Sequence, residues 1–231
     1  MLDISRIQAI TLDLDDTLWP IWPTIAKAET RLQEWLLQRA PATAALFANP
    51  HERHILRQAV EAGSPERLYD LSFMRLEMIR LGLQVSAEDQ GLAAAAFDVF
   101  FAARQEVALF ADALAALQKL SARWPVLALS NGNADVQRIG IGTFFCGSVS
   151  AHDAGAAKPD ARIFQAAADR LQLQPERILH VGDDASMDVL GAQAFGMQTV
   201  WVNRTEQVWS FNQRPDATVI SMAELCDLLS V

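Results

Sequence analysis

The chain has 231 residues, 51% of them hydrophobic and 20% charged, which is the balance of a globular protein with room for a sizeable core. A formal net charge of -9 argues against nucleic-acid backbones and anionic membranes as main partners. The two cysteines, Cys146 and Cys226, make neither a disulfide framework nor a zinc pattern. No apolar run approaches transmembrane length and no signal peptide is recognisable, so we expect a cytoplasmic protein.

The first part of the chain predicts one strand and then a long helical stretch. The apolar run from Ile7 to Leu12 indicates a buried strand that ends at Asp13. Two prolines within Trp19 to Pro23 predict a rigid turn or flap. The next eighty residues carry apolar side chains at helical spacing and no convincing strand. We expect helices over 24–40, 51–61, 65–81 and 86–104, with Pro41 ending the first and Gly82 closing the third.

Beyond Leu109 the pattern changes to short strands that alternate with helices. Strands are expected over 125–129, 147–150, 178–181, 198–202 and 217–220, and helices over 112–121, 160–171, 187–195 and 222–229. This alternation predicts an α/β fold with a Rossmann-like, three-layer core around a parallel sheet. We assign 1–18 and 108–231 to this core and 19–107 to an inserted, all-helical cap domain.

Polar residues follow several of these strands at the point where each strand ends. The clusters are Asp13, Asp15 and Thr17; Ser130 and Asn131; Asp183, Asp184 and Asp188; and, in a loop before a helix, Lys158-Pro159-Asp160. The carboxyl ends of adjacent parallel strands lie at one edge of a sheet, so all four groups are expected to meet there. Crowded carboxylates imply a cation, and oxygen ligands suit Mg²⁺. This set of groups favours phosphoryl transfer, because it offers a nucleophilic carboxylate, a second acid, a hydroxyl, a lysine and acids that bind a metal.

These four groups, in this order, resemble the signatures of the haloacid dehalogenase-like superfamily over essentially the whole chain. The signatures are Asp13-Leu14-Asp15-Asp16-Thr17, Ser130-Asn131, Lys158-Pro159-Asp160, and Gly182-Asp183-Asp184 with Asp188 further on. The resemblance implies that Asp13 attacks phosphorus and forms an aspartyl-phosphate. Asp15 would protonate the leaving oxygen and then deprotonate the hydrolytic water. Mg²⁺ would be held by the Asp13 carboxylate, the Asp15 main-chain carbonyl and Asp183.

The same resemblance implies roles for the surrounding residues. Ser130, with the amides of Asn131 and Gly132, would bind phosphate oxygens, and Lys158 would neutralise the nucleophile and the transferring group. Three further residues would lie next to the metal and its ligands. Asp188 would orient Lys158 or water, and Thr17 would brace the loop. Asp184 would support the site or be a plain turn residue. His180 is expected only to pack inward from its strand.

Asp15 favours phosphate esters as substrates, because true dehalogenases typically lack an aspartate at this position. A closer resemblance is to bacterial phosphatases that act on flavin mononucleotide and 5-amino-6-(5-phospho-D-ribitylamino)uracil in riboflavin synthesis. It rests on Leu12 to Leu18, Arg123 to Asn133, and Ile178 to Asp184 with Asp188-Val189. The chain departs from those relatives at Trp19-Pro20-Ile21-Trp22, where Trp22 would stack on a flavin or pyrimidine ring or else pack the hinge of the cap.

Three alternatives remain open at this point. A sugar phosphomutase on the same core would return phosphate to its substrate, and the sequence excludes it only weakly. A two-component receiver gathers similar groups around Mg²⁺, but its phosphoacceptor lies on a later strand and it has no cap. A catalytically idle scaffold is disfavoured because no residue needed for turnover is missing. The expected partner is a small phosphorylated substrate, and the sequence leaves the oligomeric state undetermined.

Overall fold

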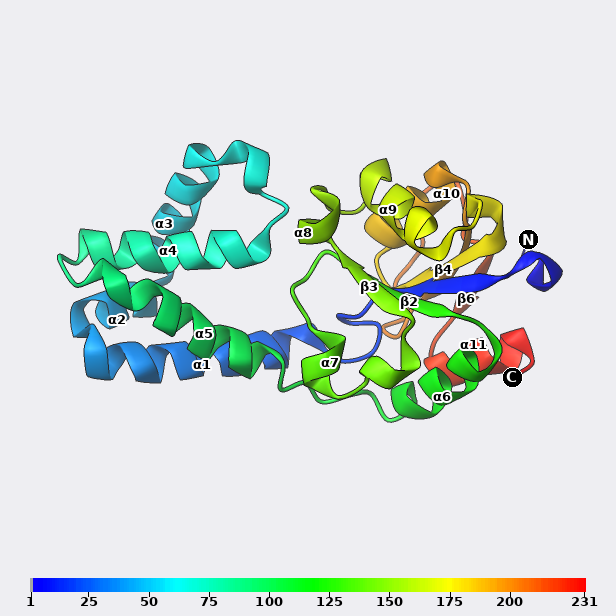
Figure 1. Ribbon diagram of the computed structural model, residues 1–231, viewed down its shortest axis with the longest axis horizontal. Coiled ribbons are helices and arrows are strands. Elements are labelled where there is room, and N and C mark those ends of the chain that lie inside the picture. The colour runs from blue at the N-terminus through cyan, green and yellow to red at the C-terminus, as the bar shows by residue number, and fades with distance from the viewer. Residues whose placement is uncertain (1) are drawn as a thin grey trace. The chain divides into compact units, whose positions relative to one another are not determined.

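The computed structural model describes residues 2–231 and divides the chain into two compact units (Figure 1). Residues up to Pro20 and from Ala108 onward form an α/β unit, and Ile21–Val107 form a helical insert. The predicted fold class is confirmed by a six-stranded sheet in which every pairing is parallel. Among residues 2–231, no helix is both long and apolar enough to cross a membrane.

The order of the strands in the sheet is β3-β2-β1-β4-β5-β6. Their bounds are β1 (Ala9–Leu12), β2 (Val126–Ser130), β3 (Gly147–Ser150), β4 (Ile178–Gly182), β5 (Gln198–Val202) and β6 (Ala217–Val219). β1, β2 and β4 are buried along their whole length, as expected of central parallel strands covered on both faces. Leu12 pairs with Ala128 and with Val181, so the three central strands end close together and direct the residues that follow to one edge.

Helices cover both faces of this sheet and complete the three layers. They are α6 (Ala113–Arg123), α7 (Val136–Ile139), α8 (Ala151–Ala154), α9 (Ala161–Leu171), α10 (Gly191–Phe195) and α11 (Met222–Leu229). α9 and α10 lie on one face and α6 and α11 on the other (Figure 1). The helix expected over 187–195 is only partly right, because Ala185–Leu190 form a wider π-helical segment before α10. The Asp184 carboxylate starts this segment by accepting from the amides of Ser186 and Met187.

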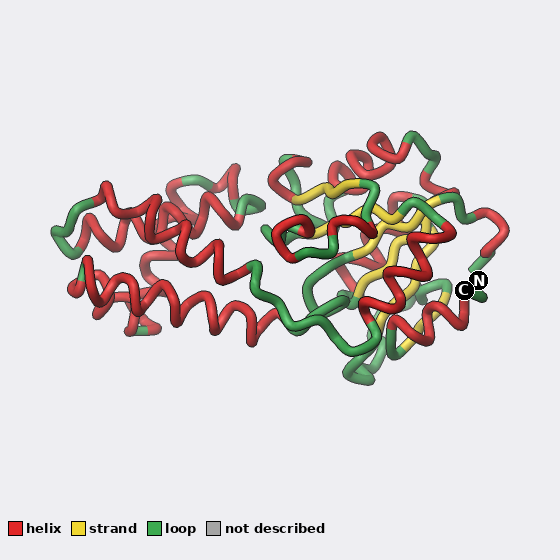
Figure 2. Tube along the Cα trace, turned by 60° about the horizontal axis from the view of Figure 1, so that its bottom comes forward, coloured by secondary structure: helices red, strands yellow, loops and turns green. Residues whose placement is uncertain are grey.

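The insert contains only helices and connecting turns (Figure 2). The helices are α1 (Ile21–Arg39), α2 (Pro41–Ala48), α3 (Pro50–Gly63), α4 (Leu71–Val85) and α5 (Ala93–Arg104). Buried side chains from all five helices form one hydrophobic core, which includes Leu32, Phe47, Leu56, Ile79 and Phe100.

Prolines in the insert begin helices where the sequence pattern suggested breaks. The rigid turn or flap expected at 19–23 is wrong in part, because α1 already begins at Ile21 and Pro23 lies in its first turn. Pro41 follows the first helix as expected but also begins α2, which the sequence analysis did not predict. A proline in the first turn lacks only an N–H that has no helical partner there, so it starts a helix without disrupting it.

The prediction that Gly82 closes the third helix of the insert is wrong. Gly82 lies inside α4. A Cβ at this position would stand 2.5 Å from Cε2 of Phe47, so the glycine lets the aromatic ring pack directly on the helix backbone. We expect Gly82→Ala to lower the free energy of unfolding by about 1–3 kcal/mol through overpacking. Thermal or urea unfolding measures the change.

Gly63→Ala is the matched control for this prediction. Gly63 is the last residue of α3, and a Cβ added there would meet no atom within 4 Å. The same substitution there is expected to be neutral or to stabilise by up to about 1 kcal/mol, because alanine favours helix more than glycine does. Equal effects at the two glycines would contradict the role given to Phe47.

Candidate active site

A tight loop after β1 presents the first acidic cluster at the edge of the sheet. The amide of Asp13 still donates to the Val181 carbonyl at 2.9 Å, so the strand pairing fixes the backbone of this aspartate. Asp16 then adopts a left-handed conformation (φ 58°), which aspartate tolerates better than most residues. The chain reverses there, and the amide of Asp16 donates to the Trp19 carbonyl at 2.7 Å. Thr17 donates its hydroxyl to Asp183 Oδ1 at 3.0 Å and so joins the loops after β1 and β4.

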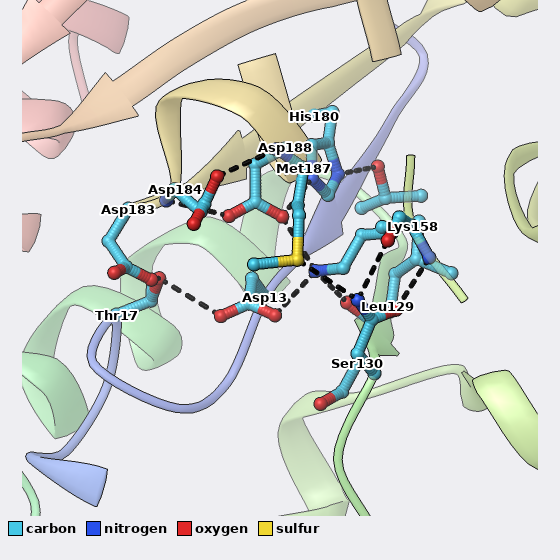
Figure 3. Close-up of polar contacts among 12 residues, drawn as sticks. Asp13, Thr17, Leu129, Ser130, Lys158, His180, Asp183, Asp184, Met187 and Asp188 are labelled. Carbon is cyan, nitrogen blue, oxygen red and sulfur yellow. Dashed lines mark hydrogen bonds and ion pairs between the residues drawn. The ribbon is translucent and has the colours of Figure 1, made fainter. Parts of the chain in front are cut away.

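The ammonium group of Lys158 lies between two buried carboxylates (Figure 3). Its Nζ is 2.5 Å from Asp13 Oδ1 and 2.6 Å from Asp188 Oδ1, and it also donates to the Leu129 carbonyl at 3.0 Å. Burial alone would lower the pKa of Lys158, but the charges of Asp13 and Asp188 outweigh burial and raise it. Lys158 is therefore a fixed positive charge beside the Asp13 carboxylate.

Asp188 is held by three donors from three different segments. Besides Lys158, His180 Nε2 lies 3.0 Å from Oδ1, and the amide of Asp184 donates to Oδ2 at 2.9 Å. Burial raises the pKa of Asp188, but the charge of Lys158 and the bond from His180 overcome this and lower the pKa well below its usual range. Gly182 makes this packing possible, because a Cβ there would overlap the side chain of Asp188.

His180 has a more specific place than the inward packing predicted from the sequence. Its Nδ1 lies 2.8 Å from the hydroxyl of Thr11, and both residues are fully buried. Burial lowers the pKa of His180, so the neutral ring is favoured. Because the Asp188 carboxylate can only accept, Nε2 carries the ring proton and Nδ1 accepts from Thr11. The only sequence signal for this contact is a histidine within an otherwise apolar strand.

Ser130, the last residue of β2, and Asn131 line the cavity at the same edge of the sheet. The Gly132 amide donates to Ser130 Oγ at 2.9 Å. The Asn131 side chain holds the main chain of Lys158: its Oδ1 accepts from the Lys158 amide at 2.6 Å, and its Nδ2 donates to the Lys158 carbonyl at 3.0 Å. The serine O–H remains to donate, and Asn131 fixes the backbone from which the lysine extends.

These residues surround a cavity of about 190 Å³. Its lining residues are Asp13, Asp15, Asp16, Ser130, Asn131, Gly132, Lys158, Asp183, Asp184, Met187 and Asp188, which include six carboxylates and one lysine. Trp22 is not among them; it lies in the first turn of α1 in the helical insert and is 76% exposed. A phosphate ester is an anion, so this cavity needs further positive charge to accept one.

The acidic groups of the cavity fit a divalent cation. Asp13, Asp183 and Asp188 each offer an oxygen within 4.8 Å of the others. Burial and the neighbouring carboxylates raise the pKa of Asp13 well above its usual range. Burial and the charge of Asp188 raise the pKa of Asp183 to about 7. Asp188 is already held by three donors, so Asp13 and Asp183 are the groups whose ionisation a cation would stabilise.

We expect Mg²⁺ to raise the melting temperature more at about pH 8 than at about pH 5.5, because protons and metal compete for the same carboxylates. The folded-state pKa of Asp183, about 7, lies above its ordinary value of 3.8. In chelator the stability that comes from this group is therefore lost as the pH rises through 7, and bound metal offsets the loss. At a metal concentration 100 times the Kd the gain is about 2.7 kcal/mol.

Thermal scans with Mg²⁺ and with chelator at both pH values test this expectation. Asp183→Asn is the control, and it should remove most of the shift caused by the metal. Equal shifts at the two pH values would contradict the assignment.

Three residues that the sequence pattern did not single out for the site hold its loops in place. The Trp19 indole N–H donates to Asp15 Oδ1 at 2.8 Å, and the Trp201 indole N–H donates to the Asp183 carbonyl at 2.7 Å. Arg204 donates to the Thr17 carbonyl at 3.1 Å and pairs with the carboxylate of Asp112. These contacts depend on how the sheet and its loops place the three residues beside the acidic loops.

Comparison with known proteins shows which family and which proteins this chain is similar to. The model of the haloacid dehalogenase-like hydrolases matches residues 7–196. The chain is 32% identical to a 5-amino-6-(5-phospho-D-ribitylamino)uracil phosphatase of Escherichia coli over 98% of both chains. It is 28% identical to a phosphoserine phosphatase of Thermus thermophilus, over 83% of this chain and 71% of that one. A crystal structure described as a 2-haloacid dehalogenase from Pseudomonas syringae superimposes with a TM-score of 0.92 at 32% identity, over 97% and 98% of the two chains.

Proposed function

Because the chain belongs to the haloacid dehalogenase-like hydrolase family, we propose that it is a phosphatase that cleaves a small phosphate monoester through an aspartyl-phosphate intermediate. The observation that carries the proposal is the ion pair between Lys158 and Asp13, in a cavity that Asp15 and Ser130 also line. It combines a nucleophile, a fixed positive charge, a proton donor and a hydroxyl around one small volume.

In the first step, a carboxylate oxygen of Asp13 attacks phosphorus and the bond from phosphorus to the ester oxygen breaks. The electron pair stays on the ester oxygen, which takes the proton of the Asp15 carboxyl, and the alcohol leaves. In the second step, Asp15 removes a proton from water, the water oxygen bonds to phosphorus, and the bond to Asp13 breaks. Lys158 and the Ser130 hydroxyl hold the phosphoryl oxygens throughout, where their charge and dipole stabilise the transition state.

Mg²⁺ is the cation that we propose for the acidic edge of this cavity. The Asp13 carboxylate, the Asp15 main-chain carbonyl and Asp183 would hold it, and it would neutralise part of the phosphate charge. Thr17 donates to Asp183 and would keep that carboxylate in place. The Asp184 amide holds Asp188, and Asp188 in turn would keep Lys158 in place.

For the substrate we propose 5-amino-6-(5-phospho-D-ribitylamino)uracil, which the name of the E. coli relative gives, or flavin mononucleotide. Both carry a flat ring, and the exposed Trp22 offers a surface on which such a ring could stack. The helical insert would then act as a cap that excludes water during the reaction.

Dehalogenation is the second candidate, favoured by the likeness to the Pseudomonas syringae structure. Halide is a stable anion and leaves without a proton, whereas an alkoxide needs one. Asp15 lies in the cavity two residues after Asp13, and this placement of an acid favours ester cleavage.

Release of inorganic phosphate with Mg²⁺ tests the proposal, using a panel of flavin mononucleotide, 5-amino-6-(5-phospho-D-ribitylamino)uracil, sugar phosphates, nucleotides and phosphoglycolate. The expected result is release from at least one ester that stops in chelator. Chloride release from 2-chloropropionate without phosphate release would favour the dehalogenase instead. Turnover only with a bisphosphorylated sugar, and without free phosphate, would indicate a mutase.

A further inference from the structure

Trp19, two residues beyond the first signature, makes a contact that the proposed mechanism does not yet use. Its side chain is completely buried, and its Nε1–H donates to Asp15 Oδ1 at 2.8 Å. The backbone on both sides of the indole is fixed as well. The Trp19 carbonyl accepts from the Asp16 amide at 2.7 Å, and the Leu18 carbonyl accepts from the Phe110 amide at 2.9 Å. The indole can therefore hold Asp15 in one place relative to the sheet.

An indole N–H is a donor in every state of the reaction, because it neither accepts a hydrogen bond nor titrates. The Asp15 oxygen that it contacts must therefore be an acceptor both when Asp15 is a carboxylate and when it is a carboxylic acid. A proton on Oδ1 would make it the hydroxyl oxygen of the acid, which accepts a hydrogen bond less well than the carbonyl oxygen, so the contact favours the proton on Oδ2.

We propose that Trp19 is a positioning residue that reserves Oδ1 of Asp15 as an acceptor and leaves Oδ2 as the oxygen that gives a proton to the leaving group and takes one from water. This inference rests on the proposed phosphatase function. The contact is local, because four residues separate donor and acceptor. It lies in the segment where the chain departs from the relatives that it resembles, and for which ring stacking or hinge packing was considered at Trp22 but no role was given to Trp19.

The leaving group provides a test that a general loss of structure would not mimic. An alkyl phosphate releases a strongly basic alkoxide and depends on the Asp15 proton, whereas 4-nitrophenyl phosphate releases a stable phenolate and depends on it little. The ratio kcat/KM includes only steps up to departure of the leaving group, so the later attack of water does not enter it. The two esters therefore separate proton donation by Asp15 from the other parts of catalysis.

Trp19→Phe keeps a large aromatic ring and removes the N–H. We expect kcat/KM for the best alkyl phosphate of the panel to fall about 10-fold, and that for 4-nitrophenyl phosphate to change less than about 2-fold. Trp124→Phe is the matched control, because Trp124 is also buried and donates its indole N–H to a main-chain carbonyl, that of Ile7, at 3.2 Å. It should change both esters equally or leave both unchanged. Equal losses for the two esters in Trp19→Phe, or no loss, would overturn the inference.

A second measurement does not depend on Trp19→Phe folding or on turnover. The chain has six tryptophans, and each contributes one indole N–H signal to a ¹H–¹⁵N spectrum. Asp15→Ala removes the acceptor, so the Trp19 signal should move upfield more than the other five. A Trp19 signal that stays in place would overturn the inference. If the wild type released phosphate from no ester, the proposed function would fail, and the spectrum would still report whether Trp19 contacts Asp15.

Discussion

Asp13→Asn is expected to abolish phosphate release, with a loss of at least about 10⁴-fold, because an amide oxygen is a poor nucleophile and cannot form the aspartyl-phosphate. The substitution keeps the shape of the side chain, and Lys158 retains Asp188 and the Leu129 carbonyl as partners. Phosphate release should be measured with the best ester, and wild-type enzyme quenched in acid should carry a phosphoryl group on the peptide that contains Asp13.

The stability of Asp13→Asn is expected to separate loss of chemistry from loss of fold. Burial raises the pKa of Asp13 above its usual range, so without metal its ionisation destabilises the folded chain as the pH rises. The neutral amide removes that penalty, and in chelator at about pH 8 the variant should melt at the wild-type temperature or above it.

Asp160→Asn is the matched control for Asp13→Asn. Asp160 is exposed, pairs with the Arg162 side chain and accepts from the Arg162 amide in the first turn of α9. Asparagine begins helices equally well, so activity should remain near the wild-type level. Retention of more than a few per cent of activity in Asp13→Asn would refute Asp13 as the nucleophile.

Lys158→Met is expected to lose both activity and stability. Without the ammonium group, two buried carboxylates face each other with no cation, and removing one partner of such a buried pair typically costs about 3–5 kcal/mol. Activity should fall by about 10³-fold, because the transferring phosphoryl group loses its fixed positive charge. Urea unfolding and phosphate release measure the two effects.

The loss of stability in Lys158→Met is expected to depend on pH, with a definite sign. In the wild type the pKa of Asp188 is lowered from its ordinary value of 3.8, so ionised Asp188 stabilises the fold at pH values above 3.8. This stabilisation disappears only as the pH falls below 3.8. In Lys158→Met the charge that lowers this pKa is gone, so the variant should lose least stability in acid and most near neutral pH. A loss of stability independent of pH would contradict this account.

Two further variants sharpen the test of Lys158. Adding Asp188→Asn to Lys158→Met removes the second unpaired charge and should restore part of the stability without restoring activity. Lys119→Met removes an exposed lysine that contacts only the carbonyl of Val231 among the hydrogen bonds of the described residues, and should change stability by less than about 0.5 kcal/mol.

The α/β fold, the parallel sheet and the edge at which the polar clusters meet could all be predicted from the sequence alone. Strand and helix periods are local properties, and the carboxyl ends of β1, β2 and β4 must lie together once the strands are parallel neighbours. Asp13, Ser130 and Asp183 could therefore be placed at one edge from the order of the signatures.

Which polar atoms meet at that edge depends on the tertiary structure. Lys158 contacts Asp13 across 145 residues, and Asn131 holds the Lys158 backbone across 27. Thr11 meets His180 from a neighbouring strand. Even the contact of Trp19 with Asp15, only four residues apart, depends on the left-handed turn at Asp16. The geometry of a hydrogen bond is set by the packing of whole strands and loops, and no local pattern of residues records it.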